Sequence, residues 1–167
     1  DALPIFLAGF IDAIAGGGGL ISLPAYLIAG LPPHAAIGTN KFSACLGTMV
    51  ATWHYAKCGF IHWKRVLPAV VTALLGSWLG ARLALLVEAD AFKIVMLIIL
   101  PLTACYVLRK KSLRDGKAPF SERKTVLITI FLALIIGVYD GFYGPGTGTF
   151  LMLLLTAVAH VSLNEAA

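Results

Sequence analysis

Charged residues are almost absent from most of this 167-residue sequence, and their scarcity restricts its possible folds more than any other feature. Nine of its 21 formal charges lie between residues 109 and 124. Soluble domains carry about 25% charged residues, whereas this chain has 13%, with 59% hydrophobic residues. So few charges cannot cover a water-soluble surface, which excludes a soluble enzyme, a nucleic-acid-binding protein and a disordered chain. The sequence therefore indicates an integral membrane protein.

Long apolar segments supply the expected membrane-spanning helices. A helix needs about 20 mostly apolar residues to cross the hydrocarbon core of a bilayer. Residues 66–87 and 91–108 meet this requirement, and residues 34–58 form a further predicted helix that contains Lys41 and His54. We therefore expect an all-α fold, a polytopic bundle of transmembrane helices.

Two glycine-rich segments interrupt the apolar pattern, at Gly16-Gly17-Gly18-Gly19 and at Gly144-Pro145-Gly146-Thr147-Gly148. Each internal glycine costs a helix about 1 kcal/mol, and proline removes a backbone donor. Irregular backbone at membrane depth must be buried in protein or line a wet cavity. The sequence predicts two glycine-broken helices, each followed by an apolar half-helix, at 20–30 and 149–159.

The two breaks resemble copies of each other, separated by a constant offset of 128 residues. The aligned residues are Gly9 with Gly137, Asp12 with Asp140, and Gly16 with Gly144. This order predicts an internal repeat, with a first transmembrane repeat over 1–108, a basic loop over 109–124 and the start of a second repeat over 125–167. We expect the second copy to be cut short at Ala167. We expect no signal peptide, since residues 2–15 lack a basic leading region. Because the chain opens with Asp1 rather than Met, we expect the beginning of the protein to be missing.

The basic loops indicate the orientation in the membrane and account for the net charge of +5. Loop 109–124 holds seven Lys and Arg residues and loop 57–65 holds three, and basic loops stay in the cytoplasm. The turn at 88–93 then faces outward. Counting crossings puts 31–34 and 160–164 on that same outer face, which predicts repeats that run parallel, related by an axis along the membrane normal.

Lys41 is the most informative single residue, because a charge inside a span costs at least about 2.5–3.5 kcal/mol. A polar stripe of His34, Gly38, Lys41, Cys45, Thr48, Thr52 and Tyr55 follows one face of its helix. The opposite face, with Phe42, Leu46, Met49, Val50 and Trp53, suits lipid. Lys41 is thus predicted to point into the protein and bind a ligand. Two alternatives stay open, snorkelling to the outer surface and a structural ion pair with Asp12 or Asp140.

The residues around the breaks favour an anionic ligand. The unpaired amides and the dipole at a helix N-terminus attract anions, and half-helices are predicted to begin near Leu20 and Thr149. Close helix packing at the glycines is the alternative explanation. Asp12 and Asp140, just ahead of the breaks, could cap exposed amides, pair with Lys41 or carry a proton through a transport cycle.

Other chemistry finds no support in the sequence. The four histidines show no metal-ligand spacing, so no metal site and no cofactor are expected. Neither break is followed by the Lys-Ser/Thr pair of a phosphate loop. Gly76 and Gly80, extended by Ala69, Ala73 and Ala84, form a small-xxx-small pattern that predicts a helix contact.

Two motifs resemble those of the sulfite-exporter (TauE/SafE-type) membrane transporters. The first runs from Gly9-Phe10-Ile11-Asp12 through Gly16–Gly19 and Pro24 to Gly38-Thr39-Asn40-Lys41, and the second runs from Tyr139-Asp140-Gly141 to Gly148. The resemblance covers essentially the whole chain. It implies a duplicated bundle of roughly eight membrane segments in the bacterial inner membrane that moves sulfite, sulfonates or other sulfur-containing anions.

The resemblance also implies which residues bind the substrate. It points to Gly16, Gly17, Gly18, Gly19, Thr39, Asn40, Lys41, Gly144, Gly146, Thr147 and Gly148, with Asp12 and Asp140 as candidate proton carriers. A second copy of the Thr39-Asn40-Lys41 segment is expected just after Ala167.

Three functions remain in competition at this stage. The leading hypothesis is a secondary transporter or exporter of a small anion, which is not an enzyme and needs only its substrate and the bilayer. A passive anion channel fits the same residues. An intramembrane enzyme acting on a lipid-linked phosphate is the third, although Ser22, Ser43 and the histidines have no evident catalytic partners. The sequence leaves the anion, the direction of transport, the coupling ion and the oligomeric state open.

Overall fold

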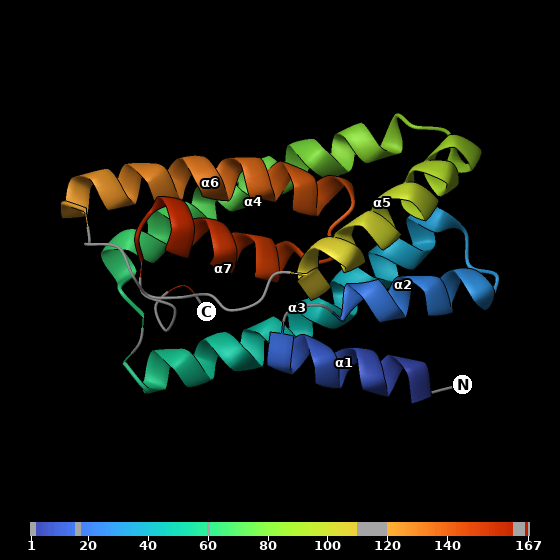
Figure 1. The fold of residues 1–167 in the computed structure, drawn as a ribbon, viewed down its shortest axis with the longest axis horizontal. Helices are drawn as coiled ribbons and strands as arrows, with labels where there is room; N and C mark the ends of the chain where they lie inside the picture. Colours follow the sequence, from blue (N-terminus) through green and yellow to red (C-terminus); the bar gives the residue numbers. More distant parts are fainter. Residues whose placement is uncertain (1–2, 16–17, 60, 110–119, 162–165, 167) are drawn as a thin grey trace.

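The computed structural model describes residues 3–15, 18–59, 61–109, 120–161 and 166, and over these residues the chain is all-α, as the sequence predicts (Figure 1). Its helices are α1 (Leu3–Ala15), α2 (Gly19–Ile28), α3 (Pro33–Lys57), α4 (Trp63–Leu85), α5 (Ala89–Arg109), α6 (Glu122–Phe142) and α7 (Thr147–Val158). Each predicted helix and half-helix is present, with ends shifted by one to three residues. The basic segment at 110–119 lies outside the described residues.

Proline and glycine set the helix boundaries at the first loops. Gly30 ends the α2 segment with φ of +88°, a left-handed conformation that glycine adopts without a steric penalty. Pro33 then occupies the first position of α3, where its missing N–H costs nothing. Gly59, with φ of +77°, follows the end of α3 in the same way. The chain therefore reverses direction at both ends of α3 because of local residue chemistry.

Two helices in the described part of the chain, α4 and α6, are long and apolar enough to cross a membrane. Most of their surface faces outward rather than into a protein core. Only 11% of the residues in the most apolar stretch of α4, and 28% of those in α6, are buried. The predicted lipid face of α3 is also exposed, from Phe42 at 72% to Trp53 at 62%. Such apolar surfaces are typical of helices that contact lipid.

Glycines bring α4 and α6 into direct backbone contact along their length. A β-carbon on Gly76 would collide with the Leu134 carbonyl oxygen, and one on Gly80 would collide with that of Val138. The contact is reciprocal, because β-carbons on Gly137 and Gly141 would collide with the carbonyl oxygens of Ala73 and Ser77 on α4. This arrangement confirms the predicted small-xxx-small contact. The order of the contacts also shows that the two helices run parallel, because later residues of α4 contact later residues of α6.

Each glycine break is a turn between two antiparallel helices rather than a kink within one span. The Tyr139 ring lies 5.5 Å from the Phe150 ring, Leu132 packs with Leu155, and the Phe120 ring stacks on His160 at 4.0 Å. Helix α7 thus runs back along α6 to the end where α6 begins. In Figure 1, the α1–α2 hairpin opens to the right and the α6–α7 hairpin opens to the left.

The prediction of parallel repeats is therefore wrong. At one end of the molecule, His34 at the start of α3 contacts the Ala84 carbonyl at 3.0 Å near the end of α4. His160 lies at the opposite end, beside the start of α6 and therefore at the level where α4 begins. Residues 31–34 and His160 thus occupy opposite ends. The two hairpins therefore open toward opposite ends of the molecule, so the second copy is inverted relative to the first.

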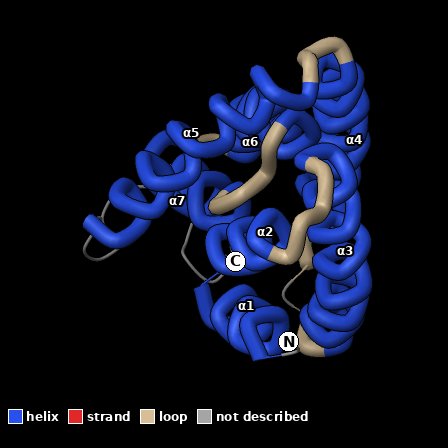
Figure 2. The backbone as a smooth tube through the Cα atoms, turned by 90° about the vertical axis from the view of Figure 1, so that its right-hand side faces the viewer, coloured by secondary structure: helices blue, strands red, loops and turns tan. Residues whose placement is uncertain are grey.

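The buried core connects the first hairpin to the rest of the bundle. It contains Leu23 and Tyr26 of α2, Ala36 of α3, Ala84 of α4, Phe92 and Met96 of α5, and Tyr143 after α6. In Figure 2, which looks nearly along the helices, α2 lies inward between α1 and α3. Because this core surrounds the end of α6, it positions the second break against α2 and α3.

We expect cysteine labelling to distinguish inverted from parallel repeats. With the native cysteines replaced, Val161→Cys and Ser121→Cys should react with an impermeant maleimide from the same side of the membrane. Leu31→Cys and Leu86→Cys should react from the opposite side. Labelling of sealed vesicles of both orientations measures this, and reaction of positions 161 and 31 from one side would contradict the inverted arrangement.

Candidate functional site

Both glycine breaks meet beside one turn of α3. A β-carbon on Gly19, at the start of α2, would lie 3.3 Å from Asn40 Nδ2 and 3.4 Å from the Cα atom of Pro145. Gly19 belongs to the first break, Pro145 to the second, and Asn40 to α3. The structure therefore brings the second break together with two segments that lie more than 100 residues earlier in the sequence.

Lys41, next to Asn40, is held by the second break. Its Nζ atom lies 2.5 Å from Asp140 Oδ1, and the two side chains are 32% and 31% exposed. A β-carbon on Gly144 would lie 2.5 Å from the same Nζ atom, so the ammonium group rests against the backbone of the break. Of the alternatives left open by the sequence, the structure shows an ion pair with Asp140. The lysine does not snorkel to the outer surface.

Asp12 has a different partner from Asp140, although the two residues align in the predicted repeat. Its Oδ1 atom accepts a hydrogen bond of 2.9 Å from the backbone N–H of Gly18. Gly18 directly precedes α2, so the carboxylate of Asp12 binds at the N-terminus of this half-helix, where a negative charge is stabilised. Capping is thus shown for Asp12 and pairing with Lys41 for Asp140.

The second half-helix begins without such a carboxylate. Gly146 precedes α7 with φ of +79°, and it has no side chain of its own to cap this N-terminus. Thr147 Oγ1 instead donates to the Gly144 carbonyl at 2.5 Å. Both half-helices begin slightly earlier than the predicted Leu20 and Thr149. Their N-termini meet the segment that carries Lys41, so the region combines a cation with two positive helix ends.

The predicted binding residues do not all gather at this place. The two breaks and the adjacent turn of α3 form one cluster. In or beside it lie Gly18, Gly19, Asn40, Lys41, Gly144 and Gly146, and Thr147 begins α7. Thr39 and Gly148 are exposed and make no contact with the cluster that the structure records. Gly16 and Gly17 lie outside the described residues.

Two residues of the cluster were not predicted from the sequence. Ser22 Oγ donates to Asn40 Oδ1 at 2.5 Å, and the Tyr139 hydroxyl donates to the Pro145 carbonyl at 2.8 Å. Ser22 holds the Asn40 amide so that its Nδ2 atom faces Gly19, and Tyr139 holds the second break against α6. Their positions in the sequence could have identified them, because each residue lies within one to two helical turns of a glycine break.

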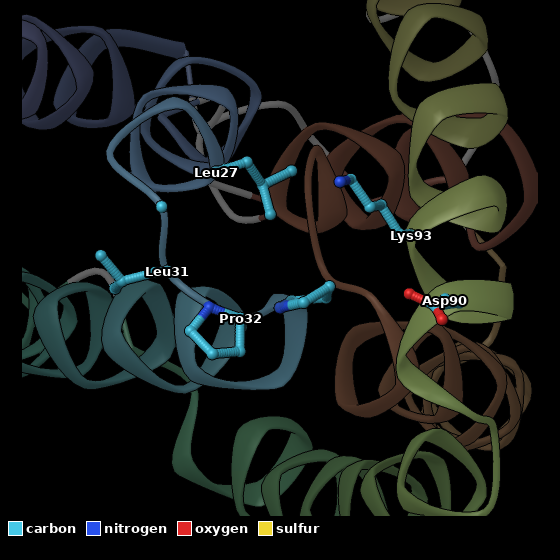
Figure 3. A pocket seen from close by; sticks show the side chains of 7 residues that line it. Leu27, Leu31, Pro32, Asp90 and Lys93 are labelled. Atoms are coloured by element: carbon cyan, nitrogen blue, oxygen red, sulfur yellow. The ribbon is translucent and has the colours of Figure 1, made fainter.

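A cavity of about 240 Å³ lies elsewhere, at the end of the molecule that holds residues 31–34 (Figure 3). Lys93 and Asp90 lie on α5 on one side, while Leu27 of α2 and Leu31 and Pro32 of the α2–α3 connection lie on the other. None of the predicted binding residues lines this cavity. Across the described ranges, no group of three His, Cys, Asp or Glu residues could hold a metal ion.

Comparison with known proteins identifies the family. The sulfite exporter TauE/SafE family matches residues 2–167. A probable membrane transporter protein, ORF9, of a Sinorhizobium species is 42% identical over 96% of this chain and 61% of its own length. A probable membrane transporter protein of Haemophilus influenzae is 35% identical over 97% of this chain and 63% of its own. The probable membrane transporter protein YfcA of Escherichia coli K12 is 34% identical over 96% of this chain and 59% of its own length.

The chain thus spans about three fifths of the length of these curated relatives. No solved structure matches it. The family match extends over both glycine breaks and over the Asn40-Lys41 turn that joins them, which are the residues that form the cluster. The chain is a membrane protein that belongs to the sulfite exporter TauE/SafE family.

Proposed function

We propose that this chain forms the anion-binding part of a secondary transporter that moves a small anion across the bacterial inner membrane. Sulfite, a sulfonate or another organosulfur anion is the proposed substrate class. The observation that carries the proposal is the meeting of one turn of α3 with both glycine breaks, with Asn40 beside Gly19 and Lys41 beside Gly144. A cation and two positive helix ends at membrane depth favour a negatively charged ligand.

The donors available at the cluster suit an oxyanion. Lys41 offers an ammonium group, and Asn40 offers an amide N–H₂ that faces Gly19. The glycines let an anion approach the backbone N–H groups closely, because they have no side chain in the way. Gly19, Gly144 and Gly146 would contribute in this manner, whereas the Gly18 N–H is already bound by the carboxylate of Asp12. Gly16, Gly17, Thr39, Thr147 and Gly148 belong to the same proposal through the family resemblance.

The inverted hairpins support transport rather than static binding. Transporters with inverted repeats bind their substrate between the repeats, near discontinuous helices whose N-termini point at anionic groups. Here the α1–α2 hairpin opens to one end and the α6–α7 hairpin to the other, and Lys41 lies where their breaks meet. Movement of one hairpin relative to the other would expose Lys41 to alternate sides. Asp12 and Asp140 are the candidate proton carriers.

The family and the relatives support the same assignment. The family is described as sulfite exporters, and three relatives are named as probable membrane transporters. The Lys and Arg residues of loops 57–65 and 109–124 favour a cytoplasmic location for both loops. The proposed protein is thus a multi-pass transporter, and the anionic substrate is inferred from Lys41 and the half-helix N-termini.

Flux measurements on proteoliposomes test this function. The full-length protein should take up sulfite or a small sulfonate with saturable kinetics, with faster uptake when unlabelled anion is present inside. Lys41→Gln should lower uptake by at least about tenfold, because the substrate loses the ammonium group proposed to bind it. Lys93→Gln, which removes a lysine at the distant cavity, serves as the matched control and should keep uptake within about twofold.

The outcomes separate the competing functions. Uptake that does not saturate and shows no exchange would indicate a channel. Uptake of equal size in Lys41→Gln and wild type would contradict the proposed site. Release of phosphate from a lipid-linked substrate would instead indicate an enzyme.

A further inference from the structure

The ammonium group proposed to bind the anion already has a negative partner, Asp140. We propose that Asp140 is an internal competitor for the substrate: it occupies the anion position on Lys41 and is displaced when the substrate binds. The inference rests on the proposed function, and it assigns Asp140 a role in substrate affinity and release.

The geometry of the pair fits an exchangeable partner. Lys41 Nζ lies 2.5 Å from Asp140 Oδ1, so one carboxylate oxygen stands where an oxygen of a bound oxyanion would stand. Both side chains are about one-third exposed, so an anion can approach the ammonium group without unfolding the cluster. Lys41 is also held against Gly144, which keeps the ammonium group in place when its partner changes.

The repeat provides a second position for the displaced carboxylate. Asp12, the equivalent residue of the first copy, accepts the Gly18 N–H at the start of α2. Asp140 stands at the same place relative to α7, and the residue equivalent to Gly18 is Gly146. Gly146, the N-cap residue of α7, has no side chain of its own to cap the helix. The carboxylate of Asp140, once displaced from Lys41, can therefore cap α7 as Asp12 caps α2.

The exchange replaces each interaction with one of the same kind. The substrate oxyanion takes over the charge-assisted hydrogen bond from Lys41, and Asp140 gains hydrogen bonds from the α7 N-terminus. Every charged group keeps a partner in both states, so the barrier from leaving a charge unpaired is avoided. The reverse exchange returns Asp140 to Lys41 and expels the anion, which gives the site a means of release.

The proposal also defines which substrates the site accepts. A ligand must carry a compact anionic group, such as a sulfite, sulfonate or carboxylate, to compete with an aspartate for Lys41. A neutral molecule leaves the Lys41–Asp140 pair intact and gains no access to the ammonium group. Asp140 thereby selects for charge as well as setting affinity.

Kinetics of the Asp140→Asn variant test the proposal. The full-length protein in proteoliposomes should show a KM for sulfite about fivefold lower than wild type, because the competing carboxylate is gone. Its maximal rate should fall, because nothing displaces the anion from Lys41. Asp140→Glu keeps a competing carboxylate and should retain a KM close to wild type. Asp90→Asn, which removes a carboxylate at the distant cavity, is the matched control and should leave both parameters unchanged.

A second measurement covers the case in which Asp140→Asn folds poorly. Sulfite should raise the thermal midpoint of the detergent-solubilised variant more than it raises that of wild type, because the anion replaces the missing carboxylate at Lys41. An unchanged or raised KM in the folded variant would overturn the proposal. A failure of sulfite to stabilise an unstable variant would do so too, since it would make Asp140 a purely structural partner.

The proposed function fails under different results. If wild type and Lys41→Gln show equal sulfite uptake, the binding site itself is wrong. If Lys41→Gln loses uptake while Asp140→Asn keeps the wild-type KM, the binding site stands and only the competitor role is wrong.

Discussion

Replacing Gly80 with alanine is expected to lower the unfolding midpoint of the detergent-solubilised protein by about 5 °C. The added β-carbon would collide with the Val138 carbonyl oxygen and lie 2.7 Å from the Phe142 backbone nitrogen. Neither atom can move alone, because both belong to the backbone of α6. The two helices must therefore separate, which weakens the packing along their whole contact.

The same substitution at Gly47 is the matched control, and it should not lower the unfolding midpoint. Gly47 lies within α3, and a β-carbon there would meet no atom within 4 Å. Alanine is favoured over glycine inside a helix by about 1 kcal/mol, so Gly47→Ala should leave the midpoint unchanged or raise it. Differential scanning fluorimetry of both variants measures the difference. Equal midpoints would show that α4 and α6 do not make the close backbone contact of the structure.

The local features of the fold could be predicted from the sequence because short-range chemistry determines them. Glycine clusters cannot continue a helix, so both breaks and both half-helices are where the residues indicate. The apolar face of α3 recurs with helical periodicity, and its residues Phe42, Met49 and Val50 are exposed as expected. The contact at Gly76 and Gly80 follows from the spacing of small residues. In each case the pattern lies within one helix.

The direction of the repeats could not be predicted, and the reason is physical. Residues 1–40 and 125–167 contain no Lys or Arg, so basic residues do not show to which side of the membrane the chain returns after either break. A helix, a glycine turn and a half-helix have nearly the same length and hydropathy as one interrupted span. Only tertiary contacts, such as the stacking of Phe120 on His160, distinguish the two cases.

The separate roles of the two aspartates were likewise beyond the sequence. Asp12 and Asp140 occupy equivalent positions, so a repeat argument assigns them equivalent partners. Among the described residues, Lys41 is the lysine beside the breaks. Because the α6–α7 turn packs against α3, this lysine pairs with Asp140. Asp12 keeps the local partner that any carboxylate would find at a half-helix N-terminus, the Gly18 N–H.

Replacing Gly144 with alanine is expected to lower anion uptake by about tenfold or more, through the position of Lys41. A β-carbon at residue 144 would lie 2.5 Å from Lys41 Nζ and 2.8 Å from Lys41 Cε. The ammonium group must move away, which breaks its contact with Asp140 and removes it from the meeting point of the half-helices. Uptake by the reconstituted variant, corrected for the amount of folded protein, measures this loss.

Backbone strain alone would also weaken the variant, so the control must share it. Gly144 has φ of +97°, where a residue with a side chain costs roughly 1–2 kcal/mol. Gly59 has φ of +77°, and a β-carbon there would meet no atom within 4 Å. Gly59→Ala should therefore lose similar stability while keeping its uptake. If both variants lose uptake equally, strain explains the effect; if only Gly144→Ala loses it, the space beside the second break is required to hold Lys41 at the site.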